Sequence, residues 1–187
     1  QVVDDWRGRR RARTWYRLAV ALEKVGRRAD ATVAVERTIE LRDDYAPAHR
    51  RLGEAYLDDG RIERAAASFE RALALDDGDL GSWHGLARCR IEEGDVVAAA
   101  EIAHDKLFRQ AAPVAHGILE QTTRLEGDFD AADRHAARAL RTTPEWPDRW
   151  AASILQYRTG EAGRRTVAMN LVRRGMFDEA IPHLEAL

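Results

Sequence analysis

The stretch APAHRRLGEAYLDDGRIERAAASFERALALDDGD, residues 46–79, decides the fold. Small and apolar side chains recur three or four positions apart on both sides of Gly60. That spacing is the period of an α-helix with one buried face. A glycine between two such segments is typical of a tight turn. The stretch therefore predicts two short helices joined at Gly60.

The same unit recurs along the chain. Five segments of helical period end in glycine, at intervals of 34, 34, 33 and 33 residues, and a second helical segment follows each of the first four. Aspartate and proline mark the linkers between units, where helices start and stop. The sequence therefore predicts a repeated unit of helix, turn, helix and short loop. The turn glycines are Gly26, Gly60, Gly94, Gly127 and Gly160.

This unit resembles the tetratricopeptide repeat (TPR), which has a 34-residue period. The resemblance implies an all-α fold, a right-handed superhelix (α-solenoid) of antiparallel helix pairs. Each pair would bury its open face against the next pair. In residues 46–79 the positions that match the family pattern are Leu52, Gly53, Tyr56, Ala65, Phe69 and Ala72.

The repeat predicts three parts in the chain. Residues 1–11 are a basic lead-in, and residues 12–146 hold four TPR-like repeats at 12–45, 46–79, 80–112 and 113–146. Residues 147–187 are expected to form irregular, truncated TPR-like helices, because Gly175 follows Gly160 by only 15 residues. A start at Gln1 and an end inside a predicted helix indicate a fragment of a longer protein.

Composition and motifs exclude several classes of function. The net charge of -2 argues against nucleic-acid binding by bulk electrostatics, and no apolar run is long enough for a membrane span. The single cysteine, Cys89, cannot form an internal disulfide and fits a cytoplasmic protein. No phosphate-binding loop, nucleophile motif or metal-ligand spacing is present. We therefore expect no catalytic residues, no metal and no cofactor in this chain.

In TPR proteins a second stripe on the first helix of each pair lines a concave groove that holds partner peptides. Carried over to this chain, the stripe contains one arginine per repeat, which suits an acidic or C-terminal-carboxylate peptide. The alternative is a solvated helix face whose charges pair along the helix, as Arg50 and Glu54 would. The candidate groove residues are Arg13, Tyr16, Arg17, Arg50, Glu54, His84, Arg88, Gln121, Arg124 and Arg158.

The predicted function is a non-catalytic scaffold that binds a partner peptide in this groove. An auxiliary positioning or oligomerisation domain of a larger enzyme, such as a glycosyltransferase, is the alternative, and self-association stays open. TPR proteins that clamp chaperone C-termini have a pattern of lysine and asparagine at set repeat positions. This chain does not resemble them, because its only asparagine is Asn170. Changing Arg50 and Arg88 to glutamate is expected to weaken ligand binding and leave the melting temperature nearly unchanged.

Overall fold

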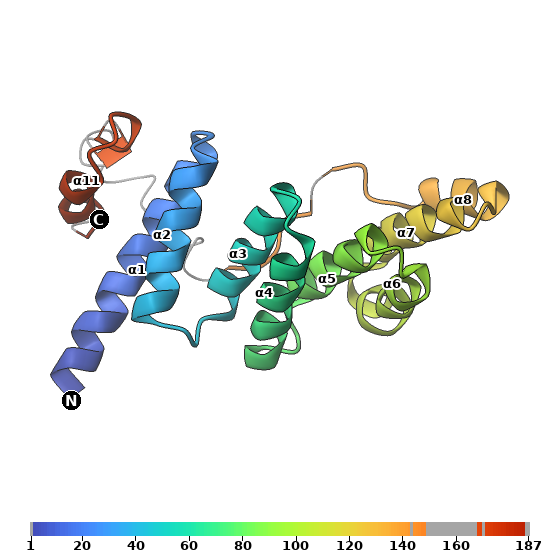
Figure 1. Ribbon diagram of the computed structural model, residues 1–187, viewed down its shortest axis with the longest axis horizontal. Coiled ribbons are helices and arrows are strands. Elements are labelled where there is room, and N and C mark those ends of the chain that lie inside the picture. Colours follow the sequence, from blue (N-terminus) through green and yellow to red (C-terminus); the bar gives the residue numbers. More distant parts are fainter. Residues whose placement is uncertain (1, 143, 149–167, 170, 186–187) are drawn as a thin grey trace. The chain divides into compact units, whose positions relative to one another are not determined.

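The computed structural model describes residues 2–142, 144–148, 168–169 and 171–185. These residues form helices and connecting segments without a strand, and successive helices pair antiparallel, so the predicted all-α class of antiparallel helix pairs is confirmed (Figure 1). The helices are α1 (Val2–Lys24), α2 (Arg28–Leu41), α3 (Ala46–Asp58), α4 (Ile62–Leu75), α5 (Leu80–Glu92), α6 (Val96–Ile102), the π-helical turn η1 (Ala103–Leu107), α7 (Phe108–Leu125), α8 (Phe129–Ala136) and α11 (Phe177–Glu185).

The chain divides into two compact units. The first unit contains residues 1–48 and 147–187, and the second contains residues 49–146. The predicted basic lead-in, residues 1–11, forms part of α1 from Val2 onward. The two units are described separately below.

The predicted turn glycines close the helix pairs. Gly26 has φ 79° and Gly60 has φ 73°, a left-handed conformation that glycine adopts without a steric penalty. The next amide donates back to the preceding helix, from Arg27 to the Leu22 carbonyl at 2.9 Å and from Arg61 to the Tyr56 carbonyl at 2.8 Å. This is the Schellman ending of a helix. Gly94, Gly127 and Gly175 repeat it, whereas Gly160 lies outside the described residues.

Phe69 forms the centre of the helix packing in the second unit. Its side chain is 0% exposed and lies between a glycine of α3 and a glycine of α5. A Cβ atom placed on Gly53 would lie 2.8 Å from the ring, and one on Gly85 would lie 2.3 Å from it. Both positions therefore need a bare backbone. The surrounding cluster contains Leu57, Ala65, Ala66, Phe69, Leu86 and Cys89.

A second cluster joins α5, α6, η1 and α7. The helix that begins at α6 widens into the π-helical turn η1, and α7 has a kink at Ala111, where φ is -138° and ψ is 47°. Pro113 follows in the first turn of the helix after the kink, where proline is tolerated. The sequence predicts a unit boundary there, and the kink lies two residues earlier. The buried members are Ala87, Ala99, Ala103, Leu107, Val114, Ala115, Ile118 and Leu119.

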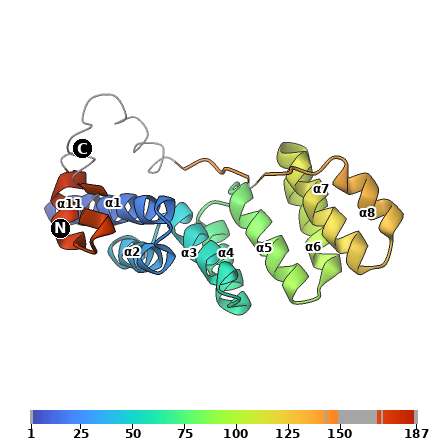
Figure 2. The ribbon, with the colours of Figure 1, turned by 90° about the horizontal axis from the view of Figure 1, so that it is seen from above.

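The fourth repeat ends earlier than its sequence suggests. Its second helix is predicted through Leu140, but α8 ends at Ala136. The Leu140 amide instead donates to the Pro113 carbonyl on α7, at 3.0 Å. From there the described residues 140–142 and 144–146 run without helix back past α7 and α5 (Figure 2). Pro144 favours this path because proline has no amide hydrogen to donate within a helix.

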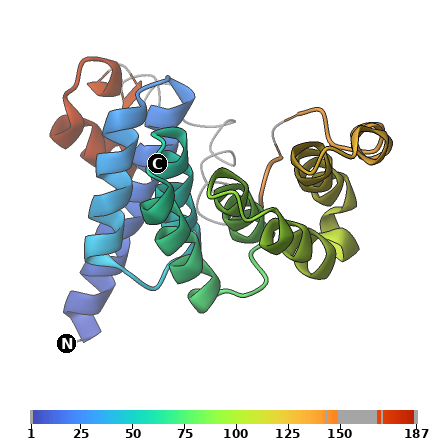
Figure 3. The ribbon, with the colours of Figure 1, turned by 45° about the vertical axis from the view of Figure 1, so that its right-hand side comes forward.

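The first unit contains the pair α1 and α2, with α11 packed against α1 (Figure 3). Arg27, in the turn between the paired helices, donates to the Val172 carbonyl, and its guanidinium lies 4.8 Å from the centre of the Phe177 ring. One arginine thus connects the α1–α2 turn to the helical turn at Gly175 that precedes α11. Gly175 has a left-handed φ of 78° in that turn.

Candidate inner-face site

The predicted groove stripe of the second unit lies on the first helix of each pair, and we call it the inner face. Its members on α3, α5 and α7 differ in exposure. Of all ten candidates, Arg13, Arg88, Gln121 and Arg124 are exposed, Arg17, Glu54 and His84 are half-buried, Tyr16 and Arg50 are buried, and Arg158 lies outside the described residues.

Arg50 is a buried structural residue. It is 2% exposed, and its Nη1 donates to Asp79, the residue at the N-cap position of α5. Ser82 Oγ donates to the same carboxylate at 2.6 Å. The expectation that reversing the charge of Arg50 leaves the melting temperature unchanged is therefore wrong. A glutamate there would place a buried carboxylate against the carboxylate of Asp79, whose side chain is 10% exposed, and breaking a buried ion pair costs about 3–5 kcal/mol.

His84 stands one turn along α5 from the buried Arg50–Asp79 pair. Burial, and to a smaller extent the positive charge of Arg88, lower the pKa of His84 to about 4. The imidazole is therefore neutral at neutral pH. Its ring lies 5.7 Å, centre to centre, from the indole of Trp146, with the two planes tilted by 44°.

Trp146 is a residue of this site that the sequence reasoning missed. A Cβ atom on Gly81 would lie 2.8 Å from Trp146 Cγ and 2.6 Å from Arg50 Cδ, so all three groups meet at the start of α5. The indole also packs against the apolar cluster of α5 to α7. The available signal was a tryptophan between Pro144 and Pro147, which marks an extended segment with an aromatic side chain.

Tyr16 has a structural place in the first unit. Its hydroxyl donates to Asp148 Oδ2, and the Tyr45 hydroxyl donates to Asp148 Oδ1 at 3.1 Å. The two phenol rings meet edge to face with centres 5.2 Å apart. Two phenol donors thus satisfy one buried carboxylate, and Tyr16 is not exposed to a ligand in this arrangement.

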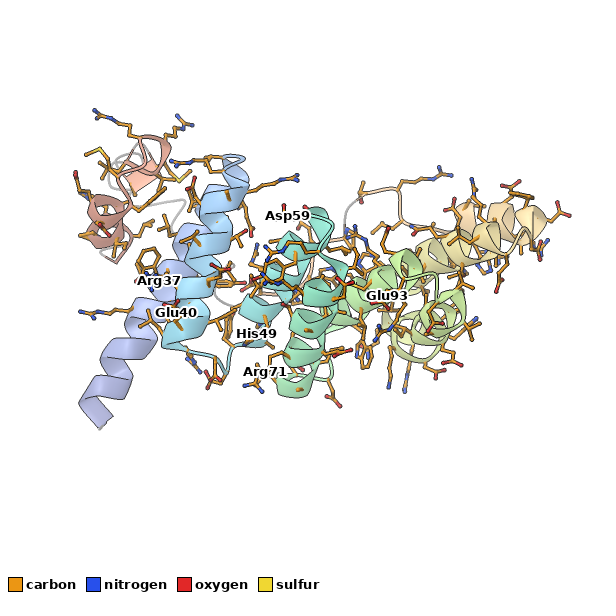
Figure 4. All side chains as sticks on the ribbon, viewed as in Figure 1. Arg37, Glu40, His49, Asp59, Arg71 and Glu93 are labelled. Carbon is orange, nitrogen blue, oxygen red and sulfur yellow. The ribbon has the colours of Figure 1, made fainter. Side chains whose placement is uncertain are left out.

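Ion pairs along and between helices account for part of the surface charge. Arg124 Nη2 lies 3.2 Å from Glu120 on the same helix, as the solvated-face alternative expects. Away from the inner face, Arg37 pairs with Glu40 on α2 at 2.6 Å (Figure 4). Exposed pairs of this kind contribute roughly 0–1 kcal/mol. Among the described residues, no ion pair is recorded for Arg88, so the alternative does not explain that arginine.

Three titratable groups with shifted pKa values make packing or helix-to-helix contacts. Burial raises the pKa of the Cys89 thiol to about 11, so it is not an activated nucleophile. His116 and His135 join α7 to α8 through their Nδ1 atoms, 2.9 Å apart, and burial lowers the pKa of each. Within the described ranges, no three His, Cys, Asp or Glu side chains are placed to hold a metal ion.

A family model described as tetratricopeptide repeat matches residues 56–121, from the end of α3 into α7. Residues 56–121 therefore belong to the tetratricopeptide repeat family. A solved TPR protein from Thermus thermophilus has a TM-score of 0.61 at 19% identity, covering 92% of this chain and 87% of its own. The crystal structure of MamA has a TM-score of 0.60 at 18% identity, covering 78% and 81%. At these identities the two structures support the TPR fold alone.

A curated relative is similar in sequence over one part of the chain. It is the Hsp70-Hsp90 organizing protein of Triticum aestivum, 42% identical over 69 residues. Those residues are 37% of this chain, and they make up 12% of that relative's length. In the part of this TPR chain that the structure describes, no helix has the length and apolar character needed to cross a bilayer.

Proposed function

We propose that this TPR chain is a non-catalytic scaffold whose inner face binds an extended segment of a partner protein. One contact carries the proposal. Trp146, in a non-helical stretch, lies against the residues of α3 and α5 to which the family resemblance assigns peptide binding. A surface that holds one extended segment of its own chain has the form to hold another.

The charge of the inner face supports an acidic ligand. Arg88 is exposed one turn beyond His84, and Arg124 is exposed on α7. Guanidinium groups bind carboxylates through paired hydrogen bonds. We therefore propose a segment that combines an aromatic side chain with acidic residues.

The partial likeness to the Hsp70-Hsp90 organizing protein brings chaperones in as candidate partners. At the positions where chaperone-clamp repeats have lysine and asparagine, this chain has Tyr16 and Val20 in one repeat and Arg50 and Glu54 in the next. Of these, Tyr16, Val20 and Arg50 are buried. The proposed ligand is therefore an acidic segment of a partner protein, bound without the chaperone clamp.

The buried groups support a binding role without catalysis. Cys89 is a free, buried thiol with a raised pKa, and His84 is held neutral by burial. Neither has the depressed or matched pKa that a nucleophile or general base needs at neutral pH. A reduced, buried cysteine also fits the proposed cytoplasmic location.

The proposal can be tested by affinity capture from lysate of the source organism. A bait with Arg88→Glu and Arg124→Glu should lose a partner that the unchanged bait captures. A control bait with Arg109→Glu and Arg134→Glu has the same charge change at two exposed positions off the inner face, and should keep it. Equal capture by all three baits would refute the inner-face assignment. If none captures a protein, the alternative as an auxiliary domain of a larger enzyme takes its place.

A further inference from the structure

Gly81 marks a place where two side chains meet bare helix backbone. Non-bonded contacts of a Cβ atom shorter than 3.0 Å are essentially absent from folded proteins. An added Cβ atom on Gly81 would be 2.8 Å from Trp146 Cγ and 2.6 Å from Arg50 Cδ. Glycine in a helix costs up to about 1 kcal/mol relative to alanine. Alanine, the better helix former, does not fit at this position, and the missing side chain makes room for an indole.

The other groups around Trp146 suit a flat aromatic ring. The neutral imidazole of His84 lies 5.7 Å from it, centre to centre, and the stem of Arg50 approaches the same glycine. On a further side are the apolar residues that join α5 to α7. Imidazole, guanidinium and alkyl groups together form a surface that favours an aromatic side chain. We call the surface of Arg50, Gly81 and His84 the tryptophan site.

The segment that fills this site has the properties of a bound peptide. Pro144 and Pro147 flank its Glu145–Trp146 pair, and prolines favour extended backbone because they restrict φ and lack an amide donor. Glu145 is exposed, whereas Trp146 is half-buried in the tryptophan site. The tryptophan thus anchors a segment that belongs to no helix.

We propose that the tryptophan site is a recognition site for proline-flanked, acidic tryptophan segments, and that residues 144–146 occupy it in the isolated chain. A partner segment of the same chemistry displaces them and places its own indole over Gly81. This inference rests on the proposed function, because it specifies which side chain of the partner segment enters the inner face. The site is therefore both the anchor for a ligand and the place where the chain competes with that ligand.

The experiment uses a fluorescein-labelled peptide of sequence TTPEWPD, residues 142–148, added to the full chain and followed by fluorescence anisotropy. A tethered segment competes at an effective concentration of about 1 mM, so removing it should tighten a peptide with a dissociation constant near 0.1 mM by roughly 10-fold. Trp146→Ala should therefore bind the peptide about 10-fold more tightly than the unchanged chain. A peptide with alanine in place of tryptophan should bind neither.

Two further variants test the site itself. Trp146→Ala combined with Gly81→Ala should lose the peptide, because the new methyl group would lie 2.8 Å from the position of the indole Cγ, too close for an indole to enter. Trp146→Ala combined with Gly117→Ala is the matched control, since a Cβ atom on Gly117 meets nothing within 4 Å, and it should bind as Trp146→Ala does. Circular dichroism checks that each chain is helical. Undiminished binding by the Gly81→Ala double variant would overturn the proposal.

Three other results would also overturn it. One is equal peptide affinity for the unchanged chain and Trp146→Ala. If Trp146→Ala does not fold, Trp146→Phe replaces it and should bind the peptide with an affinity between those expected for the unchanged chain and for Trp146→Ala. The second refuting result is a peptide affinity of Trp146→Phe equal to that of the unchanged chain. The last is a dimer in light scattering that Trp146→Ala dissociates, because the segment would then be exchanged between two copies.

The proposed function and the tryptophan site can fail separately. If the chain binds TTPEWPD in a way that Gly81→Ala abolishes but captures no protein from lysate, the tryptophan site is supported and the scaffold function is refuted. If the chain captures a partner that excess TTPEWPD does not release, the scaffold function is supported and the tryptophan site is refuted.

Discussion

Gly85→Ala should destabilise the chain although alanine is the better helix former. Gly85 lies within α5, where the change to alanine alone would contribute up to about 1 kcal/mol. The added Cβ atom would lie 2.3 Å from the Phe69 ring, whose side chain is 0% exposed and closed in on its other side by Gly53. The ring has no free space to enter. Overpacking of this kind costs about 1–3 kcal/mol.

The matched control is Gly117→Ala on α7. This glycine also lies within a helix, and an added Cβ atom there meets nothing within 4 Å. It should therefore gain up to about 1 kcal/mol, so the two alanine variants should differ by about 2 kcal/mol. In a chain of this size that corresponds to roughly 4–8 °C in melting temperature, with Gly85→Ala below the unchanged chain. Thermal unfolding followed by circular dichroism measures it.

A second substitution identifies the cause. Phe69→Leu removes the ring that meets the new methyl group, so the double variant with Gly85→Ala should be more stable than the sum of the single changes. The coupling in this double-mutant cycle should be at least about 1 kcal/mol, within the range for residues in contact. A melting temperature for Gly85→Ala that rises as much as for Gly117→Ala would refute the packing argument, and so would a cycle without coupling.

Four other measurements test the assignments above. Phe69→Ala should lower the free energy of unfolding by about 3–5 kcal/mol in urea titration, as core aromatic truncations do, and a loss below about 1 kcal/mol would remove it from the core. Arg50→Glu should cost about 3–5 kcal/mol, whereas Arg88→Glu should change stability by at most about 0.5 kcal/mol, because only the first breaks a buried ion pair. Since the pKa of His84 is about 4 when folded and 6.5 when unfolded, the folded chain binds fewer protons between these values, and stability should fall from pH 6.5 to pH 4 by up to about 3 kcal/mol. His84→Gln should flatten that slope. Cys89 should react with a thiol reagent at neutral pH only when the chain unfolds, so prompt reaction of the folded chain would contradict its burial.

The features that the sequence predicts well depend on residues close together along the chain. The Gly26 and Gly60 turns are examples. In each, the glycine is left-handed and the amide of the next residue donates to a carbonyl five positions earlier, so every contact is local. The core position of Phe69 follows from the same local period. The all-helical fold and the antiparallel pairing of its helices then follow from the repetition of one unit.

The features that the sequence could not predict depend on contacts between distant residues. The helical period places Arg50 on the inner face but says nothing about Asp79, 29 positions later, which turns that position into a buried ion pair. Trp146 meets Gly81 across an even longer separation. The early end of α8 depends on the Pro113 carbonyl, an acceptor on another helix. Periodicity carries no information on any of these three.

The departures from local rules meet at one place, and this supports a functional interpretation of that place. Gly81 is a poor helix former at the start of a helix, Arg50 is a charge taken out of water, and Trp146 lies in a non-helical segment over helices. Each one alone lowers stability or goes against the repeat pattern. In a chain whose other units follow their local preferences, such conflicts are expected where function needs them. If the tryptophan site were only a packing detail, TTPEWPD should bind Trp146→Ala no more tightly than it binds the unchanged chain, and Gly81→Ala should not change that binding.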